Sequence, residues 1–378
     1  MPNDSSLDRL IVRGYRSIRE LDLTLPSDVT VFIGANGSGK SNIVSALEVV
    51  SRVWEGGHEA YVTQHGGMSS LRFAGSDAPS DTQIEIHGRQ ADGVRHGYRL
   101  TLTPSVTDED DLPIIRNERL YWDENKHRRP YDEAIPRDLQ TVKDSTDWHL
   151  RQFVENVLPV VAGCRVFHFD DVGQDAPSKG WSSPGDDVAL RSNAENIAAY
   201  LRRVRDEHPR YYRRIVTAVA AAAPFFGDFI LEPGRSGRLR LRWRQRGLDR
   251  VFTAHEMSDG TLRFVCLATL LLGPDRPSTI ILDEPELGLH PAAINILAEM
   301  IGTAAQDSRR VIVATQSVTL LSQFDVSEIA VVERHNGATV AVRPDQERLT
   351  EFLKEYSVGS LWEMNLLGGR PTPERLDQ

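Results

Sequence analysis

Eight residues near the start of the chain have the types and spacing to bind a phosphate group. The run Gly34-Ala35-Asn36-Gly37-Ser38-Gly39-Lys40-Ser41 follows an apolar segment at 29–33 and precedes a segment with helical periodicity. Glycines let the backbone curl until successive N–H groups point at one anion, and a helix that starts at about Lys40 directs its positive end at the same anion. In this pattern Lys40 reaches the β- and γ-phosphates of a nucleotide, and Ser41 is a ligand of Mg²⁺.

Two acidic residues further along the chain predict a site of phosphate transfer. Asp283 and Glu284 follow Ser278-Thr279-Ile280-Ile281-Leu282, an apolar run that predicts a strand buried on both faces. At the end of such a strand, Asp283 would lie beside the phosphate loop and hold Mg²⁺ with its water shell. Glu284 would polarise a water for attack on the γ-phosphate. Acidic residues also follow strands as helix caps, but the phosphate loop favours the catalytic interpretation.

A third segment predicts a second anion site. Ser258, Asp259 and Gly260 precede the helical run 264–272, and Ser258 is placed to cap that helix. A serine and a glycine at a helix start form such a site only if another phosphate is presented to them. Taken alone, the segment is more typical of an ordinary helix cap.

With these three segments in place, the chain resembles the RecF/SMC-like ABC-type ATPases. More narrowly, it is similar to the compact bacterial predicted AAA-family ATPases that are related to the OLD-family ATPase module. The resemblance covers most of the length and includes the segments 10–18, 34–42, 166–171, 282–291 and 311–317. It implies an α/β fold of the P-loop NTPase type, with a mixed sheet, an antiparallel subsheet and a helical lobe.

The resemblance also implies roles for individual residues. Arg16 would approach the nucleotide from the first strand, 166–171 would take the place of the Q-loop, and Glu286 to Pro291 would form the D-loop at a dimer interface. Gln316 would be the switch residue behind the γ-phosphate. The implied nucleotide-binding residues are Arg16, Gly34, Ala35, Asn36, Gly37, Ser38, Gly39, Lys40, Ser41, Asn42, Ser258, Asp259 and Gly260; the implied catalytic residues are Glu284, Lys40 and Gln316, and the implied metal ligands are Ser41 and Asp283.

The function that the resemblance implies is ATP hydrolysis coupled to dimerisation, with ATP and Mg²⁺ as cofactors. In this group the Ser258 position contacts ATP bound by the opposite subunit, so a homodimer would close around two ATP molecules and open after hydrolysis. Relatives are often suspected of roles in antiviral (phage) defence or DNA maintenance. The chain has no cluster of carboxylates that would form a nuclease, so we expect a separate effector protein to carry out any DNA cleavage.

Two departures from the family pattern leave alternatives open. Asp259 stands where transporter signatures carry glycine, and Gln316 stands where many ABC ATPases have histidine. An amide orients a water but cannot take its proton, so we expect slow hydrolysis. One alternative is a non-hydrolysing sensor that uses ATP only to dimerise. A transporter motor subunit is a weaker alternative, because 286–291 and the opening strand look unlike that group.

Arginine alternates with apolar residues over 238–246, which predicts a strand with one apolar and one cationic face. The cationic positions are Arg238, Arg240, Arg242, Arg244 and Arg246. One interpretation is a surface for DNA or an acidic partner, since clustered arginines release counterions on binding DNA. The other is a solvated edge strand whose charges pair with nearby carboxylates. The sequence does not favour either.

Composition limits the possible functions. The chain has 378 residues, of which 40% are hydrophobic, and a net charge of −10, so it is globular and is no general polyanion binder. Cys164 and Cys266 lie in apolar surroundings, which predicts reduced core residues in a cytoplasmic protein. The first residues show no signal-peptide pattern, and the longest apolar runs are too short to span a membrane.

The elements that must position these residues can be placed coarsely. We expect two strands within 8–33, a helix over about 40–54, and an antiparallel hairpin of 82–88 with 97–103 whose turn is 91–93. A peripheral excursion at 105–145 and a helical lobe at about 193–226 follow. The expected lobes are an N-terminal ATPase lobe (1–172), a helical and arginine-strand lobe (173–255) and a C-terminal ATPase lobe (256–378).

Overall fold

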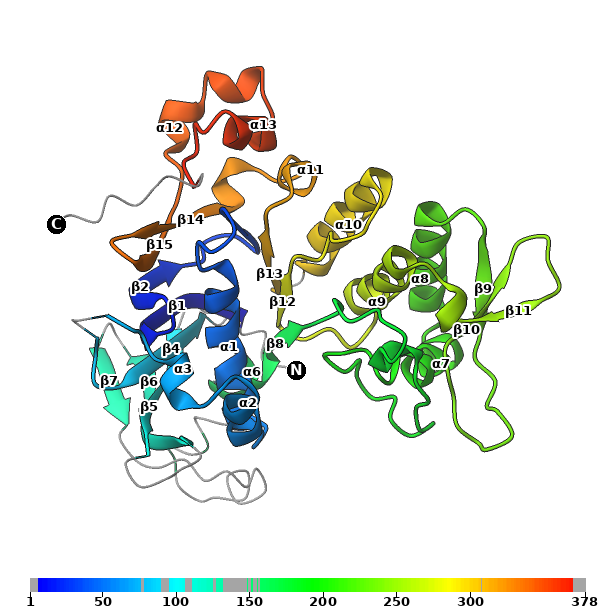
Figure 1. The fold of residues 1–378 in the computed structure, drawn as a ribbon, viewed down its shortest axis with the longest axis horizontal. Helices are drawn as coiled ribbons and strands as arrows, with labels where there is room; N and C mark the ends of the chain where they lie inside the picture. The colour runs from blue at the N-terminus through cyan, green and yellow to red at the C-terminus, as the bar shows by residue number, and fades with distance from the viewer. Residues whose placement is uncertain are drawn as a thin grey trace.

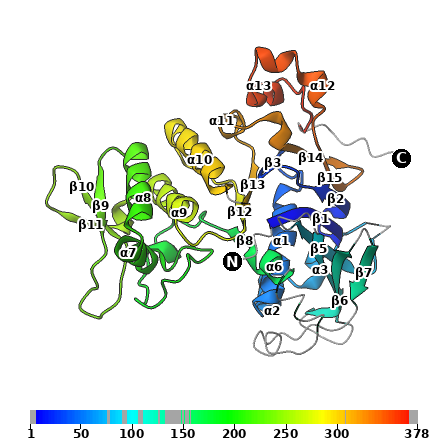
Figure 2. The same ribbon diagram turned by 180° about the vertical axis from the view of Figure 1, so that it is seen from behind.

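Three sheets and a set of helices form the part of the chain that the structure describes (Figure 1). The structure is a computed structural model, and it describes residues 6–75, 78–89, 95–105, 111–124, 127–131, 148, 151, 155, 157–306 and 308–369. An antiparallel sheet and a helical lobe lie on opposite sides of a central sheet (Figures 1 and 2). The expected α/β architecture, with a mixed sheet, an antiparallel subsheet and a helical lobe, is confirmed.

The central sheet has the order β15-β14-β3-β13-β12-β8. Its strands are β3 (Val29–Ile33), β8 (Cys164–Phe167), β12 (Thr279–Asp283), β13 (Arg310–Thr315), β14 (Ile329–His335) and β15 (Ala338–Val342). Neighbouring strands are parallel except β14 and β15. The carboxyl ends of β3, β13, β12 and β8 therefore meet at one edge, where open α/β sheets bind their ligands.

The second sheet is antiparallel, in the order β2-β1-β4-β5-β6-β7. Its strands are β1 (Ser6–Tyr15), β2 (Ile18–Thr24), β4 (Thr82–Arg89), β5 (Arg95–Pro104), β6 (Pro113–Glu124) and β7 (His127–Tyr131). The expected hairpin of β4 and β5 is confirmed, and its turn at 91–93 lies outside the described residues. Of the expected excursion at 105–145, β6 and β7 extend this sheet at its edge, and 106–110, 125–126 and 132–145 lie outside the described residues.

The prediction of two strands within 8–33 was wrong, because the chain forms three: β1, β2 and β3. The additional reversal occurs at Arg16, whose φ is 47°. A left-handed backbone is rare for an arginine, so no ordinary turn residue marks this reversal in the sequence.

Helices cover both faces of the central sheet. They are α1 (Lys40–Trp54), α2 (His58–Gln64), α3 (Met68–Leu71), α6 (Leu158–Gly163), α7 (Ile197–Glu207), α8 (Pro209–Ala222), α9 (Asp259–Leu272), α10 (Pro291–Ala304), α11 (Val318–Leu321), α12 (Gln346–Leu349) and α13 (Val358–Glu363). Short 3₁₀ turns are η2 (Pro177–Lys179), η3 (Ala254–Glu256), η4 (Val326–Glu328) and η5 (Phe352–Lys354). The third sheet, β11 (Val251–Thr253), β10 (Arg242–Gln245) and β9 (Phe226–Ile230), lies at the far end of the helical lobe (Figure 1).

Buried residues form two hydrophobic clusters, one on each face of the central sheet. In β3, Val31 and Ile33 belong to the cluster shared with α7, α8, α9 and α10, while Phe32 belongs to the cluster shared with α1 and the antiparallel sheet. Both faces are covered, and this explains why the central strands read as continuous apolar runs. Cys164 and Cys266 are buried and unpaired with each other, as expected, and burial raises the pKa of each thiol to about 12.

Membrane-spanning helices were not expected. Among the described residues, the structure contains no helix with both the length and the apolar composition to cross a bilayer.

Candidate functional site

Strand register brings the predicted phosphate and carboxylate segments to one edge of the central sheet. Ile33, the last residue of β3, is level with Thr315 of β13, and Asp283 of β12 is level with Ala314. The loop 34–39 leaves β3 at this edge and leads into α1. Its glycines, Asp283, Glu284 and Gln316 therefore lie at neighbouring strand ends.

Two glycines of the loop are required by their surroundings. Gly39 has φ of 106°, and a Cβ atom there would lie 2.0 Å from Oγ1 of Thr339 on β15. A Cβ atom on Gly34 would lie 2.2 Å from the carbonyl oxygen of Val332 on β14. The Thr339 hydroxyl donates to the carbonyl of Ser38 at 3.0 Å. Strands β14 and β15 therefore shape the loop from behind.

The Lys40 ammonium lies inside this loop. Its Nζ donates to the carbonyl oxygens of Gly34 at 2.8 Å and Ala35 at 3.2 Å, and the residue is only 5% exposed. Burial lowers the pKa of Lys40, although the nearby carboxylates of Glu284, Asp283 and Glu286 act in the opposite direction. The cation has two neutral backbone partners, and a phosphate could replace them.

Asp283 and Ser41 offer oxygen atoms suited to Mg²⁺. Burial is the main cause of a raised pKa for the Asp283 carboxyl, with Glu284 adding to it, and a hydrogen bond from Ser41 opposes the shift. Within the described part of the chain, Oδ1 of Asp283 is buried without a hydrogen-bond partner. Mg²⁺ usually takes one or two protein oxygens and completes its shell with phosphates and water. The pair therefore fits a magnesium ion.

Glu284 sits on strained backbone. Its φ is 44°, and its N–H donates to the carbonyl of Ala314 at 2.7 Å. A left-handed conformation costs a non-glycine residue roughly 1–3 kcal/mol and tends to occur at functional sites. The strained residue therefore stands directly after Asp283, at the end of β12.

Arg16 lies beside the start of α1. Its Nη1 is 3.5 Å from Oδ1 of Asn42, and Nδ2 of Asn42 donates to the Ser17 hydroxyl at 2.6 Å. Ser17 in turn is hydrogen-bonded to Thr339 at 2.6 Å. The β1–β2 turn therefore lies beside the start of α1 and β15, and the approach of Arg16 to the nucleotide stays a prediction.

Ser258, Asp259 and Gly260 form a second group, at the start of α9 in the helical lobe. The Ser258 hydroxyl accepts from the Thr261 N–H at 3.3 Å, which confirms the predicted cap. A Cβ atom on Gly260 would lie 2.2 Å from the Gly288 carbonyl, so this helix start packs on the predicted D-loop. Among the described residues, no hydrogen bond or ion pair joins this group to the loop 34–41 of the same chain.

The surroundings of this second group were only partly predicted. Asp259 is exposed and lies 3.9 Å from Nζ of Lys179, a basic partner for its carboxylate. His290, expected as an interface residue, caps α10 by accepting from the Ala292 N–H at 3.2 Å. Ser258, Gly260, Gly288 and His290 line a cavity of about 140 Å³.

Arg263 was missed from the sequence. It lies on α9, is 9% exposed, and donates from Nε to the Phe169 carbonyl at 2.9 Å and from Nη2 to the Asp170 carbonyl at 2.9 Å. Its Nη1 also donates to the Leu287 carbonyl. One guanidinium thus joins the predicted Q-loop segment to the predicted D-loop. The sequence signal that could have identified Arg263 is a single cation among the apolar residues of α9.

His168, in the predicted Q-loop segment, contacts α1. Its Nε2 lies 3.0 Å from Oε2 of Glu48. The contact raises the pKa of His168, and, against the effect of burial, it helps to lower the pKa of Glu48. The ion pair therefore joins the residue that follows β8 to α1.

The arginine segment differs from the prediction. Leu239, Leu241 and Trp243 are buried as expected, but β10 covers only Arg242–Gln245. Arg238 donates to the Trp181 carbonyl and Arg242 to the Glu232 carbonyl, each at 2.6 Å. Arg240 stacks 5.0 Å above the Trp181 ring. The predicted strand over 238–246 was therefore wrong. Loop carbonyls bind Arg238 and Arg242, and an aromatic ring binds Arg240. Arg240 and Arg242 are half-buried, while Arg238, Arg244 and Arg246 are exposed.

Comparison with known proteins adds relatives. A family model described as AAA domain, putative AbiEii toxin, Type IV TA system matches residues 29–322. The Old nuclease of Escherichia phage P2 is 35% identical over 78 residues, 21% of this chain and 13% of that protein. The DNA replication and repair protein RecF of Edwardsiella ictaluri (strain 93-146) is 33% identical over 89 residues, 23% of this chain and 21% of that protein. The chain thus spans less than a quarter of either relative.

Solved structures share the fold more completely. The crystal structure of an SMC head bound to the C-terminal winged-helix domain of ScpA matches with a TM-score of 0.62 and 19% identity. The match covers 92% of this chain and 99% of that one. At this identity the likeness establishes the fold.

Proposed function

We propose, from the premise that the chain belongs to the AAA-domain family described as putative AbiEii toxin, Type IV TA system, that it binds ATP with Mg²⁺ and hydrolyses it. The chain is an ABC-type ATPase related to the RecF, SMC and OLD proteins. The observation that supports the proposal is that Lys40, at the start of α1, lies near the carboxylates of Asp283 and Glu284 at the end of β12. A magnesium-bound triphosphate would give the Lys40 ammonium an anionic partner and the carboxylates a cationic one.

Each residue has a role in the proposed reaction. The backbone N–H groups of the loop 34–41 and the start of α1 hold the phosphates, and Lys40 moves from the Gly34 and Ala35 carbonyls to the β- and γ-phosphate oxygens. Ser41 and Asp283 would hold Mg²⁺, which supplies charge neutralisation on the phosphates. Glu284 polarises the attacking water, and Gln316 orients it through hydrogen bonds.

Closure of two chains around the nucleotides completes the proposed cycle. The start of α9, with Ser258 and Gly260, would contact the phosphates bound by the second chain and stabilise the transition state. Support comes from the packing of Gly260 on Gly288, which places this helix start beside the predicted D-loop. The proposed lobes, 1–172, 173–255 and 256–378, would change their relative position on closure, and a separate effector protein in the cytoplasm would respond.

Phosphate release tests hydrolysis directly. We expect wild-type protein to release phosphate from ATP slowly and Glu284→Gln to release at least about 100-fold less, while both bind ATP with similar Kd. Glu299→Gln is the matched control, because Glu299 is exposed on α10. If wild type and Glu284→Gln release phosphate at the same rate, the enzyme reading fails. The alternative function, a non-hydrolysing sensor, would then replace the ATPase function. Gln316 and Asp259 are the residues that favour this alternative.

A further inference from the structure

The carboxylate of Glu286 is buried where the chain leaves β12 for α10. The residue is 6% exposed, and its Oε1 accepts a hydrogen bond from the Thr315 hydroxyl. Among the described residues, Oε2 has no hydrogen-bond partner. The Thr315 donor belongs to the segment that carries the proposed switch residue, Gln316.

Thr315 connects the two sides of this junction. Its side chain is fully buried, and its Oγ1 accepts from the Ser317 N–H at 2.9 Å while its hydroxyl donates to Glu286. One residue earlier, the Ala314 carbonyl accepts from the Glu284 N–H at 2.7 Å. Gln316 is therefore held through its neighbours Thr315 and Ser317. The Ala314 carbonyl joins the same strand end to the strained residue Glu284.

A gain in folding stability is a poor explanation for the burial of the Glu286 carboxylate. Taking an ionised group out of water is costly, and replacing buried polar pairs by apolar residues of similar volume is often neutral or stabilising. Burial raises the pKa of Glu286, and the hydrogen bond from Thr315 acts in the opposite direction. Glu286 is thus a buried acid whose hydrogen-bond partner, Thr315, directly precedes the proposed switch residue Gln316.

We propose that Glu286 is a positioning residue for hydrolysis: through Thr315, whose hydroxyl also binds the Ser317 N–H, it fixes the Gln316 amide relative to Glu284. The inference rests on the proposed function and deepens it by naming the pair that holds the switch. Glu286 does not touch the phosphates in this role. Because a small misplacement of a water-orienting group lowers the rate strongly, the pair affects turnover rather than ATP binding.

Threonine variants test the pair with little change of volume. Thr315→Val removes the hydroxyl and should lower kcat roughly 10- to 100-fold while KM and Kd for ATP stay within about twofold of wild type. Thr315→Ser keeps the hydroxyl and should restore most of kcat. Glu286→Met should resemble Thr315→Val, and the double variant should be no slower than the slower single variant, since both changes break the same contact.

Several results would overturn the inference. Wild-type kcat in Thr315→Val would do so, as would losses that multiply in the double variant or an equal loss in Thr315→Ser. Hydrogen exchange gives a readout that does not depend on turnover: the amides of Gln316 and Ser317 should exchange faster in Glu286→Met than in wild type, with most other amides unchanged. If wild type releases no phosphate, the proposed function fails by itself, and unchanged exchange at these amides would refute the positioning contact separately.

Discussion

At the scale of single residues, the candidate site depends on charges held in buried positions. Burial lowers the pKa of Lys40 and raises the pKa of Asp283, so the charged form of each group is less stable than it would be in water. A magnesium-bound triphosphate supplies negative charge to the first and positive charge to the second. We therefore expect the nucleotide to stabilise the folded protein, because a ligand that binds only the folded state adds to its stability.

The contact between His168 and Glu48 predicts that the folding stability depends on pH. The raised pKa of His168 means that the contact contributes stability below the ordinary value of 6.5 and loses it as pH rises through the higher folded value. Because the His168 side chain is 40% exposed, the contribution should be no more than about 1 kcal/mol. Urea unfolding of His168→Gln should therefore approach wild type in stability at alkaline pH.

The control for this experiment is His255→Gln, because His255 is exposed. Its unfolding free energy should lie within about 0.5 kcal/mol of wild type. A His168→Gln deficit that grows with pH would contradict the ion pair.

Residue patterns in the sequence located most of the candidate site but few of its partners. The loop 34–41 and the capped helix start at Ser258 follow from local chemistry, since spacing and capping are properties of neighbouring residues. The contacts of Glu286 with Thr315, and of Arg263 with Phe169, join positions far apart in the chain. Such partners depend on the tertiary fold, and no local pattern specifies them.

At the scale of elements, Arg263 holds α9 to two loops. Its three carbonyl acceptors would lose their donor in Arg263→Met, and a buried acceptor without a partner costs about 1–3 kcal/mol. We expect the unfolding free energy to fall by roughly 3 kcal/mol in guanidinium denaturation. Arg263→Lys should recover only part of the loss, because an ammonium lacks the planar fork of five donors.

Arg348→Met provides the comparison, since Arg348 is exposed on α12. It should change stability by less than about 0.5 kcal/mol. An Arg263→Lys protein as stable as wild type would show that the three-way contact contributes little.

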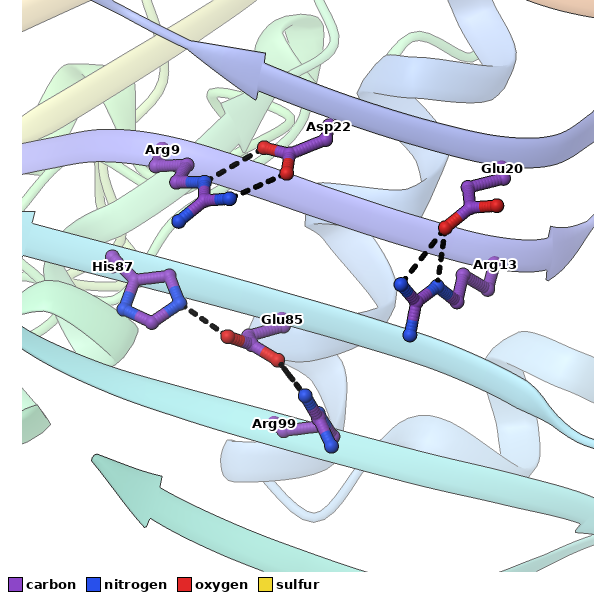
Figure 3. A network of polar contacts seen from close by, with 7 residues as sticks. All are labelled: Arg9, Arg13, Glu20, Asp22, Glu85, His87 and Arg99. Atoms are coloured by element: carbon purple, nitrogen blue, oxygen red, sulfur yellow. Dashed lines mark hydrogen bonds and ion pairs between the residues drawn. The ribbon is translucent and has the colours of Figure 1, made fainter. Parts of the chain in front are cut away.

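A buried ion pair on the antiparallel sheet gives a second prediction for elements. Glu85 on β4 is hydrogen-bonded to His87 and Arg99, and Arg13 pairs with Glu20 on the same face (Figure 3). Burial opposes ionisation of Glu85, but its partners lower its pKa to about 2. Glu85→Gln should lower the unfolding free energy by about 3 kcal/mol at neutral pH, because it breaks a buried pair.

The pH dependence of this loss has a definite sign. A carboxyl with a depressed folded pKa contributes stability above its unfolded pKa of about 4.3 and loses it as pH falls toward 2. The difference between wild type and Glu85→Gln should therefore shrink in acid. Glu20→Gln, whose pair is exposed, should cost less than about 1 kcal/mol, and an equal cost for both variants would refute the role of burial.

The elements themselves were predictable where their periodicity was strong. Helix α1 and strand β12 appear where the sequence placed them, because capping, glycine spacing and continuous apolar runs are local signals. Strands β6 and β7 fell within a polar segment that read as an excursion. Strand β7 is the edge of its sheet, and edge strands commonly carry charged residues, so hydrophobic alternation gives little indication of it.

At the scale of the whole molecule, charge is distributed unevenly. The chain carries a net charge of −10, yet residues 226–256, which include β9, β10 and β11, hold seven arginines and four acidic residues, a net charge of +3. We propose that this end of the helical lobe contacts DNA. The support is local charge together with the exposure of Arg244 and Arg246.

Charge reversal at the two exposed arginines tests DNA contact. Arg244→Glu with Arg246→Glu should weaken DNA binding and reduce its salt slope by roughly 2, while Kd for ATP is unchanged. Arg348→Glu with Lys354→Glu makes the same change of charge on the C-terminal helices and should leave DNA affinity near wild type. Equal effects of the two double variants would indicate a general charge effect instead of a local surface.

The account depends most on nucleotide-driven pairing of two chains, so the molar mass of Glu284→Gln with ATP and Mg²⁺, measured by light scattering, tests it most directly. We predict twice the mass of one chain with ATP, the mass of one chain without it, and a single-chain mass for Glu284→Gln combined with Ser258→Arg, in which ATP remains bound. A single-chain mass for Glu284→Gln saturated with ATP would contradict the account.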